Sequence, residues 1–360
     1  MKQRVQWIDI AKGIAILAVI VGHTLGPYTG DFWGSLIFAV HMPVFFILSG
    51  YLFRVRTFRQ EFTNGASKLL VPFAVTGGLV VFLSALAARL PANFILNRYF
   101  PSIRAGLLGA LYGAGSEVYN PWGWHVQPIG AIWFLVSLFL ALQLFNGWLR
   151  VTSHFPHVVF WQVAGILLMT VLGGVLGKVA YLPWAVNAAL LSQAFLYAGY
   201  LFKQYQVFER LPNETYLLWS FLWLLSAFQG YFVLTNASSP NLVISLLGGI
   251  AGSLCLFKVS QWLCQFQNKV AVSWLKRYGR ESLVVLCFHL IDLDVIGIAG
   301  PLVKIVTSYS TVWLGVWAGI IYRISFATLW LVLMPKIPLL RNCYLPHSFP
   351  LKIRHIKKMT

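Results

Sequence analysis

Apolar residues occur along this chain in long runs, and polar residues gather in the short segments between them. A run of about 20 apolar residues is long enough for a helix to cross the hydrocarbon core of a bilayer. The sequence therefore predicts an all-α integral membrane protein, a bundle of about ten transmembrane helices in one domain at residues 1–340, followed by a basic cytoplasmic tail at 341–360. The predicted spans are residues 13–30, 34–53, 69–90, 130–149, 158–177, 183–202, 215–235, 241–263, 283–303 and 312–334.

The composition excludes a water-soluble protein. Of the 360 residues, 59% are hydrophobic and 10% are charged, against about 25% charged residues in soluble domains. The formal net charge of +18 would suggest nucleic acid in a soluble protein. Here the positive charge falls mostly between the spans, so membrane lipids are the expected partner and nucleic acid is not.

The positive charge is also distributed unequally between alternate connections. Placing the N-terminus in the cytoplasm leaves few cations outside, namely Arg89, Arg98, Arg104, Lys178 and Lys304. The inside then holds Lys2, Arg4, Lys12, Arg54, Arg56, Arg59, Lys68, Arg150, Lys203, Arg210, Lys258, Lys269, Lys276, Arg277, Arg280 and the tail from Lys336 to Lys358. This asymmetry predicts an even number of spans with both termini cytoplasmic.

Three ionisable residues near the N-terminus are the first candidates for chemistry. Lys12 and His23 lie in the first span, and His41 lies near the outer start of the second. Such groups are costly inside a membrane and therefore indicate function. Eleven residues make about three helical turns, which predicts that Lys12 and His23 share one face about 16 Å apart. Two histidines at similar depth suit a general base and a partner that orients it. The alternative is that each imidazole binds a backbone carbonyl or lines a helix contact.

The basic segment after the second span is the next candidate. Arg56 and Arg59 are three residues apart, so on a helical turn both guanidinium groups would clamp one phosphate, with Lys68 beyond them. The alternative is that they are ordinary cytoplasmic charges that fix the topology.

Late in the chain, the ninth span carries His289, which we expect nearer the cytoplasmic side than His23. Asp292 follows at the spacing that places two side chains on one helix face. Arg323 in the tenth span needs an acidic partner if it is buried. Four cysteines show no metal-ligand spacing, and no nucleotide or zinc motif is present, so we expect no metal site.

Taken together, five segments resemble the acyltransferase 3 family of integral membrane acyltransferases. They are Lys12 with His23, the run from His41 to Gly50, Arg56 with Arg59, Trp133 to Leu135, and Gly279 leading to His289. The sequence departs from the family in having Lys12 where many members have arginine. It also has Ala131-Ile132 where many have His-Leu, a place that His125 or Gln127 would have to fill.

The resemblance implies transfer of an acyl group, usually acetyl, from acyl-CoA to a hydroxyl of a bacterial cell-surface or exported glycan, or of a lipid-linked sugar. Acetyl-CoA would be a donor substrate and not a permanently bound cofactor, with its phosphates on Arg56, Arg59 and Lys68. His23 would be the general base or an acyl relay, supported by His41 and Lys12. Trp133, together with Glu117 and His125 of the long outer connection at residues 91–129, would hold the sugar.

The expected location is the bacterial cell membrane. A homodimer is one assembly that the sequence allows. The alternative function is a proton-coupled transporter of a small molecule or glycan precursor, in which buried His and Asp form a proton relay.

Overall fold

The computed structural model describes residues 5–91, 95–266, 268–346 and 348–349. The charges predicted at Lys2 and Arg4, and most of the predicted tail, lie outside the described residues. Within them the chain is helical, with no β-sheet and with isolated bridges between Leu96 and Ile296 and between Val233 and Ser238.

In the first half, two pairs of consecutive helices follow each other closely. The turn at residues 39–42 separates α2 from α3, and a π-helical segment, Ala66–Leu70, joins α4 to α5. The bounds are α1 Gln6–Thr24, α2 Phe32–Phe38, α3 Pro43–Tyr51, α4 Phe58–Gly65, α5 Val71–Ala87, α6 Ile103–Tyr112, α7 Trp133–Thr152, α8 Val158–Val179 and α9 Val186–Leu191.

The second half also mixes long and short helices. The bounds are α10 Gln193–Gln204, α11 Val207–Arg210, α12 Thr215–Gln229, α13 Leu242–Leu263, α14 Val270–Arg280, α15 Ser282–Asp294, α16 Ala299–Tyr309, α17 Val312–Leu333 and α18 Pro338–Tyr344. α18 begins before the predicted tail boundary, and its Tyr344 is buried.

The described residues contain seven helices that are long and apolar enough to cross a membrane. They are Gln6–Thr24, Phe32–Tyr51, Phe58–Ala87, Gly130–Thr152, Val158–Val179, Leu242–Phe266 and Val312–Lys336. An eighth is obtained if α9 and α10, which meet at an angle of 47°, are counted as one broken span. The chain is therefore an all-α multi-pass membrane protein, whereas the count of ten and the cytoplasmic position of both termini stay predictions.

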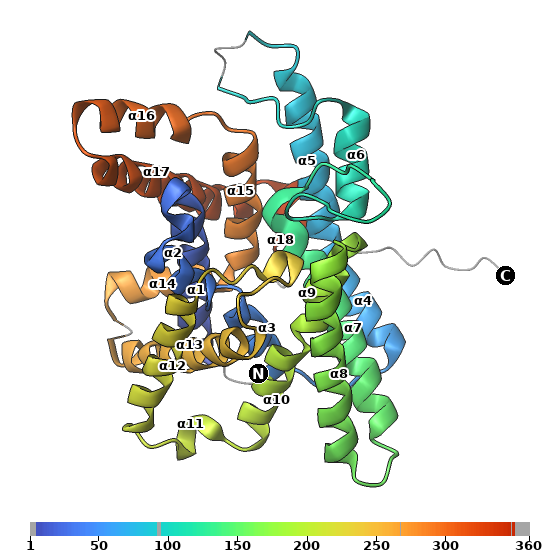
Figure 1. Ribbon diagram of the computed structural model, residues 1–360. Coiled ribbons are helices and arrows are strands. Elements are labelled where there is room, and N and C mark those ends of the chain that lie inside the picture. The colour runs from blue at the N-terminus through green and yellow to red at the C-terminus, as the bar shows by residue number, and fades with distance from the viewer. Residues whose placement is uncertain (1–4, 92–94, 267, 347, 350–360) are drawn as a thin grey trace, which may run out of the picture.

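The two remaining predicted spans, residues 215–235 and 283–303, do not form single long helices. α12 has 15 residues, which gives a length of about 22 Å at the usual rise of an α-helix. The other span is interrupted after Asp294, where α15 ends, and α16 begins at Ala299. Figure 1 shows α16 turned away from α15 and running beside α17.

Helix α1 occupies a central place because small residues let its neighbours approach closely. It contacts α3, α13, α14, α15 and α17 (Figure 1). A Cβ atom on Gly279 of α14 would lie 1.7 Å from the backbone oxygen of Asp9, and one on Gly13 would lie 2.1 Å from that of Leu275. Any larger residue at either glycine would push α14 away from α1.

The same device fixes α3, which follows His41. A Cβ atom on Gly50 would lie 1.9 Å from the backbone oxygen of Leu196, and one on Gly199 of α10 would lie 1.9 Å from that of Ile47. α3 is consequently held against α10 on one side and α1 on the other. The first crossing thus fixes α14 against α1, which carries Lys12 and His23, and the second fixes α10 against α3, which follows His41.

Candidate functional site

The first histidine of the chain is paired with the last one of the membrane domain. His23 Nδ1, near the end of α1, lies 3.3 Å from Nε2 of His289 on α15. The two rings are stacked, with centroids 5.5 Å apart and planes 9° from parallel. His289 is almost fully buried, and its Nδ1 has no hydrogen-bond partner among the described residues. The pair therefore forms a dyad inside the helix bundle.

This geometry corrects the expectation that His289 lies nearer the cytoplasmic side than His23. The expectation assumed that its helix starts at the membrane surface. In the structure α14 occupies that level, packed along the first turns of α1, and Ser282 at the start of α15 shares a cavity with Lys12 and Ile16. The seven helical steps from Ser282 to His289 then cover about 10 Å, which places His289 beside His23.

His41 lies in the turn before α3 and is buried. Its Nδ1 is 3.0 Å from the backbone oxygen of Ile37. Because a carbonyl oxygen only accepts, Nδ1 carries the hydrogen and Nε2 keeps a free lone pair in the neutral ring. The carbonyl contact expected for a structural histidine is thus present, and the other ring nitrogen remains available. Phe38 lies between His41 and His23, with its ring centroid 4.5 Å from that of His41 and 5.9 Å from that of His23.

A buried ion pair lies directly behind the dyad. Arg323 of α17 places Nε 3.4 Å from Oδ2 of Asp292, and Tyr322 donates a 2.9 Å hydrogen bond to Oδ1 of the same carboxylate. Arg323 Nη1 lies 3.3 Å from the backbone oxygen of His23 and 3.4 Å from Thr24 Oγ1. Asp292, expected beside His289, is therefore the partner of Arg323, and the pair holds the end of α1 that carries His23.

Two cavities in the described part of the chain meet beside α1. The cavities are called outer and inner after the predicted topology. The outer cavity, of about 300 Å³, is lined by both histidines of the first two spans and by Trp133. The inner cavity, of about 520 Å³, is lined by Lys12, Lys68 and Arg280. Three apolar side chains line both cavities, namely Val19, Met42 and Leu286. A basic cavity and a histidine-bearing cavity thus adjoin at these three apolar side chains, which are called the constriction below.

The predicted phosphate clamp has a different local geometry from a helical turn. α4 begins at Phe58 with Thr57 as its N-cap, and Thr57 and Gln60 form a capping box, so Arg56 precedes the helix. Arg56 Nη1 is 2.9 Å from Oε2 of the buried Glu61, while Arg59 is exposed. Lys68 lies within electrostatic range of this ion pair and points into the inner cavity.

The predicted sugar-binding residues separate into two groups. Trp133 is buried at the start of α7 and lines the outer cavity. Glu117 and His125 are exposed on the connection between α6 and α7 and do not line it. Gly115 and Ser116, just before Glu117, do reach the cavity, and a Cβ atom on Gly115 would collide with the Trp133 ring.

Several lining residues were missed by sequence reasoning. Ser116 has a buried hydroxyl with no hydrogen-bond partner among the described residues, and Tyr231 and Thr235 come from the connection between α12 and α13. Tyr344 of α18 lines the inner cavity and exchanges a 2.9 Å hydrogen bond with Thr76. Ser282 also lines the inner cavity, and unlike these residues it belongs to a segment that the sequence had singled out, the one from Gly279 to His289.

Comparisons with known proteins agree on one family. A family model described as an acyltransferase domain matches residues 5–334. The nodulation protein NolL of Sinorhizobium fredii is 31% identical over 157 residues, 40% of this chain and 39% of that protein. NolL of Mesorhizobium japonicum is 27% identical over 231 residues, 60% of this chain and 51% of that protein. The matched segments thus span about half or less of these curated relatives, and no solved structure matches the chain.

Proposed function

The chain belongs to the acyltransferase domain family and is a membrane acyltransferase, and from this premise we propose that it moves an acyl group, acetyl above all, from acyl-CoA to a hydroxyl of a cell-surface or exported glycan. The observation that carries the proposal is the pair of cavities that meet at Val19, Met42 and Leu286. A cationic chamber suits the phosphates of CoA. A chamber with imidazoles suits the activation of a hydroxyl.

In the proposed reaction the inner cavity is open to the cytoplasm of a bacterial cell. The pantetheine arm of the donor lies along it and brings the thioester carbonyl to the constriction. The acceptor hydroxyl enters the outer cavity beside Trp133. Holding the two substrates at one point removes most of the entropic cost of their encounter.

His23 is the proposed general base. If its Nδ1–H donates to Nε2 of His289, its own Nε2 has the lone pair that accepts a proton. The hydroxyl oxygen then bonds to the thioester carbon, its proton passes to His23, and the carbon–sulfur bond breaks. The proton on His23 neutralises the departing thiolate. An acyl-imidazole relay through the same nitrogen is the alternative route.

His289 and His41 are assigned supporting roles. Neutral His289 accepts the hydrogen bond that becomes stronger when His23 is charged, so it stabilises the imidazolium. His41 faces the same cavity and orients the acceptor or the developing oxyanion.

The function is tested with purified protein in nanodiscs, acetyl-CoA labelled in the acetyl group, and envelope glycan from the source cell as acceptor. We expect release of CoA and alkali-labile label in the glycan. A protein that carries solutes across liposomes but yields no labelled glycan would instead support the proton-coupled transporter.

Filling the constriction is the most direct test of the path. Val19→Phe is expected to lower transfer more than tenfold while the dissociation constant of CoA stays unchanged, because the larger ring would fill the junction between the two cavities that Val19 lines. Unchanged CoA binding also shows that the variant is folded. Val19→Ala, which widens the same position, should retain transfer. Normal turnover by Val19→Phe would contradict a path through this constriction.

Variants of the basic residues test the donor site. Lys68→Met and Arg59→Gln are each expected to weaken CoA binding about tenfold, the usual loss for one charge-assisted contact. Arg56→Gln should in addition lower the melting temperature, because it leaves the buried Glu61 without its cation. Arg210→Gln, which removes an exposed cation from another connection, is the matched control. Equal affinity in all four variants would show that these cations only fix the topology.

A further inference from the structure

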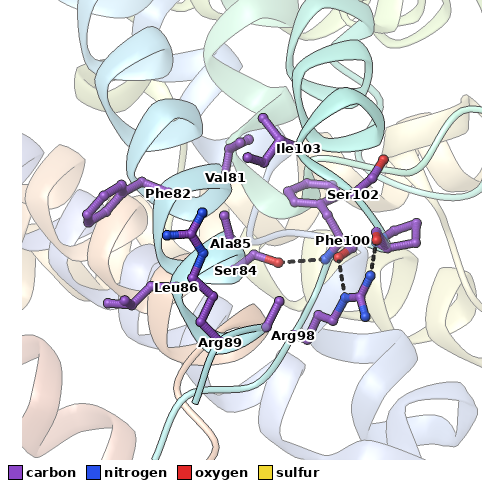
Figure 2. A pocket seen from close by; sticks show the side chains of 12 residues that line it. Val81, Phe82, Ser84, Ala85, Leu86, Arg89, Arg98, Phe100, Ser102 and Ile103 are labelled. Atoms are coloured by element: carbon purple, nitrogen blue, oxygen red, sulfur yellow. Dashed lines mark hydrogen bonds between the residues drawn. The ribbon is translucent and has the colours of Figure 1, made fainter.

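A third cavity, of about 400 Å³, lies away from the acyl-transfer path at the end of α5. One wall is the last turns of α5 and the other is the segment from Arg98 to Ile103 that leads into α6 (Figure 2). The lining combines exposed apolar side chains with two guanidinium groups, those of Arg89 and Arg98. Nothing in the acyl-transfer chemistry uses this groove.

The groove is a fixed feature of the fold. Ser84 of α5, which is buried, accepts a 2.8 Å hydrogen bond from the backbone N–H of Phe100 and so ties the two walls together. Phe100 is buried against α6. Arg98 donates from Nε to the backbone oxygen of Phe100 and from Nη2 to that of Pro101, which sets the position of its guanidinium.

The charge at this place is unusual for the predicted topology. Outer connections hold few cations under that topology, and three of the five named above, Arg89, Arg98 and Arg104, lie within 16 residues of sequence. The sequence contains no Asp or Glu between Glu61 and Glu117. None of the three arginines forms an ion pair with a described residue, and the guanidinium of Arg89 has no hydrogen bond to one. Positive charge on the outer side runs against the general preference of Lys and Arg for the cytoplasmic side. An anionic ligand would account for it.

The apolar part of the groove faces where lipid chains would be. α5 belongs to a candidate span that ends at Ala87, so we expect Arg89 at the level of the headgroups. Phe82 is 64% exposed and Ile103 is 56% exposed, and both line the groove. Figure 2 shows Phe82 and Leu86 on the α5 side, next to Arg89, with Arg98 on the opposite wall.

We propose that this groove binds the phosphate-bearing headgroup of an anionic membrane lipid, with Arg89 as the principal phosphate ligand, Arg98 as the second, and Phe82, Leu86 and Ile103 against the hydrocarbon chain. Arginine suits phosphate because its planar donors bond two oxygens at once. An apolar wall that continues from the charged end distinguishes a lipid from a free phosphate ion. The inference does not depend on the acyl donor or the glycan acceptor.

The test is a titration of the full-length protein in detergent with fluorescently labelled phosphatidylglycerol, followed by anisotropy. Arg89→Gln is expected to raise the dissociation constant about tenfold, the usual loss for one charge-assisted contact. Arg98→Gln should raise it as well. Arg104→Gln is the matched control, because this exposed arginine lies in the same segment but does not line the groove. Melting temperatures verify that the variants are folded.

Competition identifies the ligand chemistry. Unlabelled phosphatidylglycerol should displace the probe, whereas diacylglycerol, which lacks the phosphate, and inorganic phosphate, which lacks the chains, should not at the same concentration. Displacement by inorganic phosphate alone would assign the groove to a free anion and overturn the lipid proposal. An equal loss of affinity in Arg104→Gln and Arg89→Gln would also overturn it, because it would show attraction by diffuse charge without a defined site.

Discussion

Replacing His23 by alanine is expected to lower the rate of acyl transfer roughly 10²–10⁴-fold, the usual contribution of a general base. His23→Gln should be as inactive, because an amide keeps hydrogen bonding but cannot take a proton. The measurement is single-turnover release of CoA from acetyl-CoA in the presence of glycan. A purely structural histidine would behave differently, since glutamine would restore activity and alanine would lower the melting temperature as well.

The dyad makes this prediction sharper. If His289 supports His23 through the 3.3 Å contact, His289→Leu should also lower transfer strongly. The double variant should be little worse than either single one, because groups that act as a unit are not additive. His154→Ala, which removes an exposed imidazole between α7 and α8, is the control and should be fully active. Near-normal transfer by His23→Ala would remove His23 from the mechanism and leave His41 as the remaining imidazole on the outer cavity.

Local sequence patterns predicted the features that are determined by residues close together in the chain, namely long helices and the positions of side chains along one helix. The apolar runs predicted the seven long helices, and the eleven-residue spacing placed Lys12 and His23 on α1, which carries one to the inner and the other to the outer cavity. Lys12 with His23, and the run from His41 to Gly50, could be recognised because each is a short continuous stretch of sequence, the first on α1 and the second in the turn before α3 and in α3 itself. The inward position of Trp133 is likewise set by the start of α7.

The rest depends on how helices pack, which one sequence does not encode locally. His23 and His289 are 266 residues apart in sequence, and their pairing follows from the depth at which α15 starts behind α14. The role of Tyr344 as a cavity wall was hidden because its segment reads as a basic tail. Arg56 resembled a phosphate ligand by spacing, whereas the capping box of α4 places it before the helix, beside Glu61.

The second large effect is expected at Arg323. Its side chain is 11% exposed and that of Asp292 is 1% exposed. Removing one partner of a buried ion pair leaves the other charge without compensation and costs about 3–5 kcal/mol. Arg323→Met should therefore lower the melting temperature markedly and reduce transfer, because the carboxylate of Asp292 is stranded and the end of α1 loses a donor. Lys304→Gln, which removes an exposed cation from the adjacent α16, should change neither.

A double variant separates stability from positioning. In Arg323→Met/Asp292→Leu both charges are absent, and replacement of a whole buried pair by apolar residues is often neutral. We expect its melting temperature to recover toward that of the wild type. Its turnover should stay low with an unchanged KM for acetyl-CoA. In the double variant the backbone oxygen of His23 has lost the 3.3 Å hydrogen bond from the Arg323 guanidinium, so the end of α1 is no longer held in place. Recovery of turnover together with stability would show that the ion pair only holds α15 to α17 and does not position the histidine.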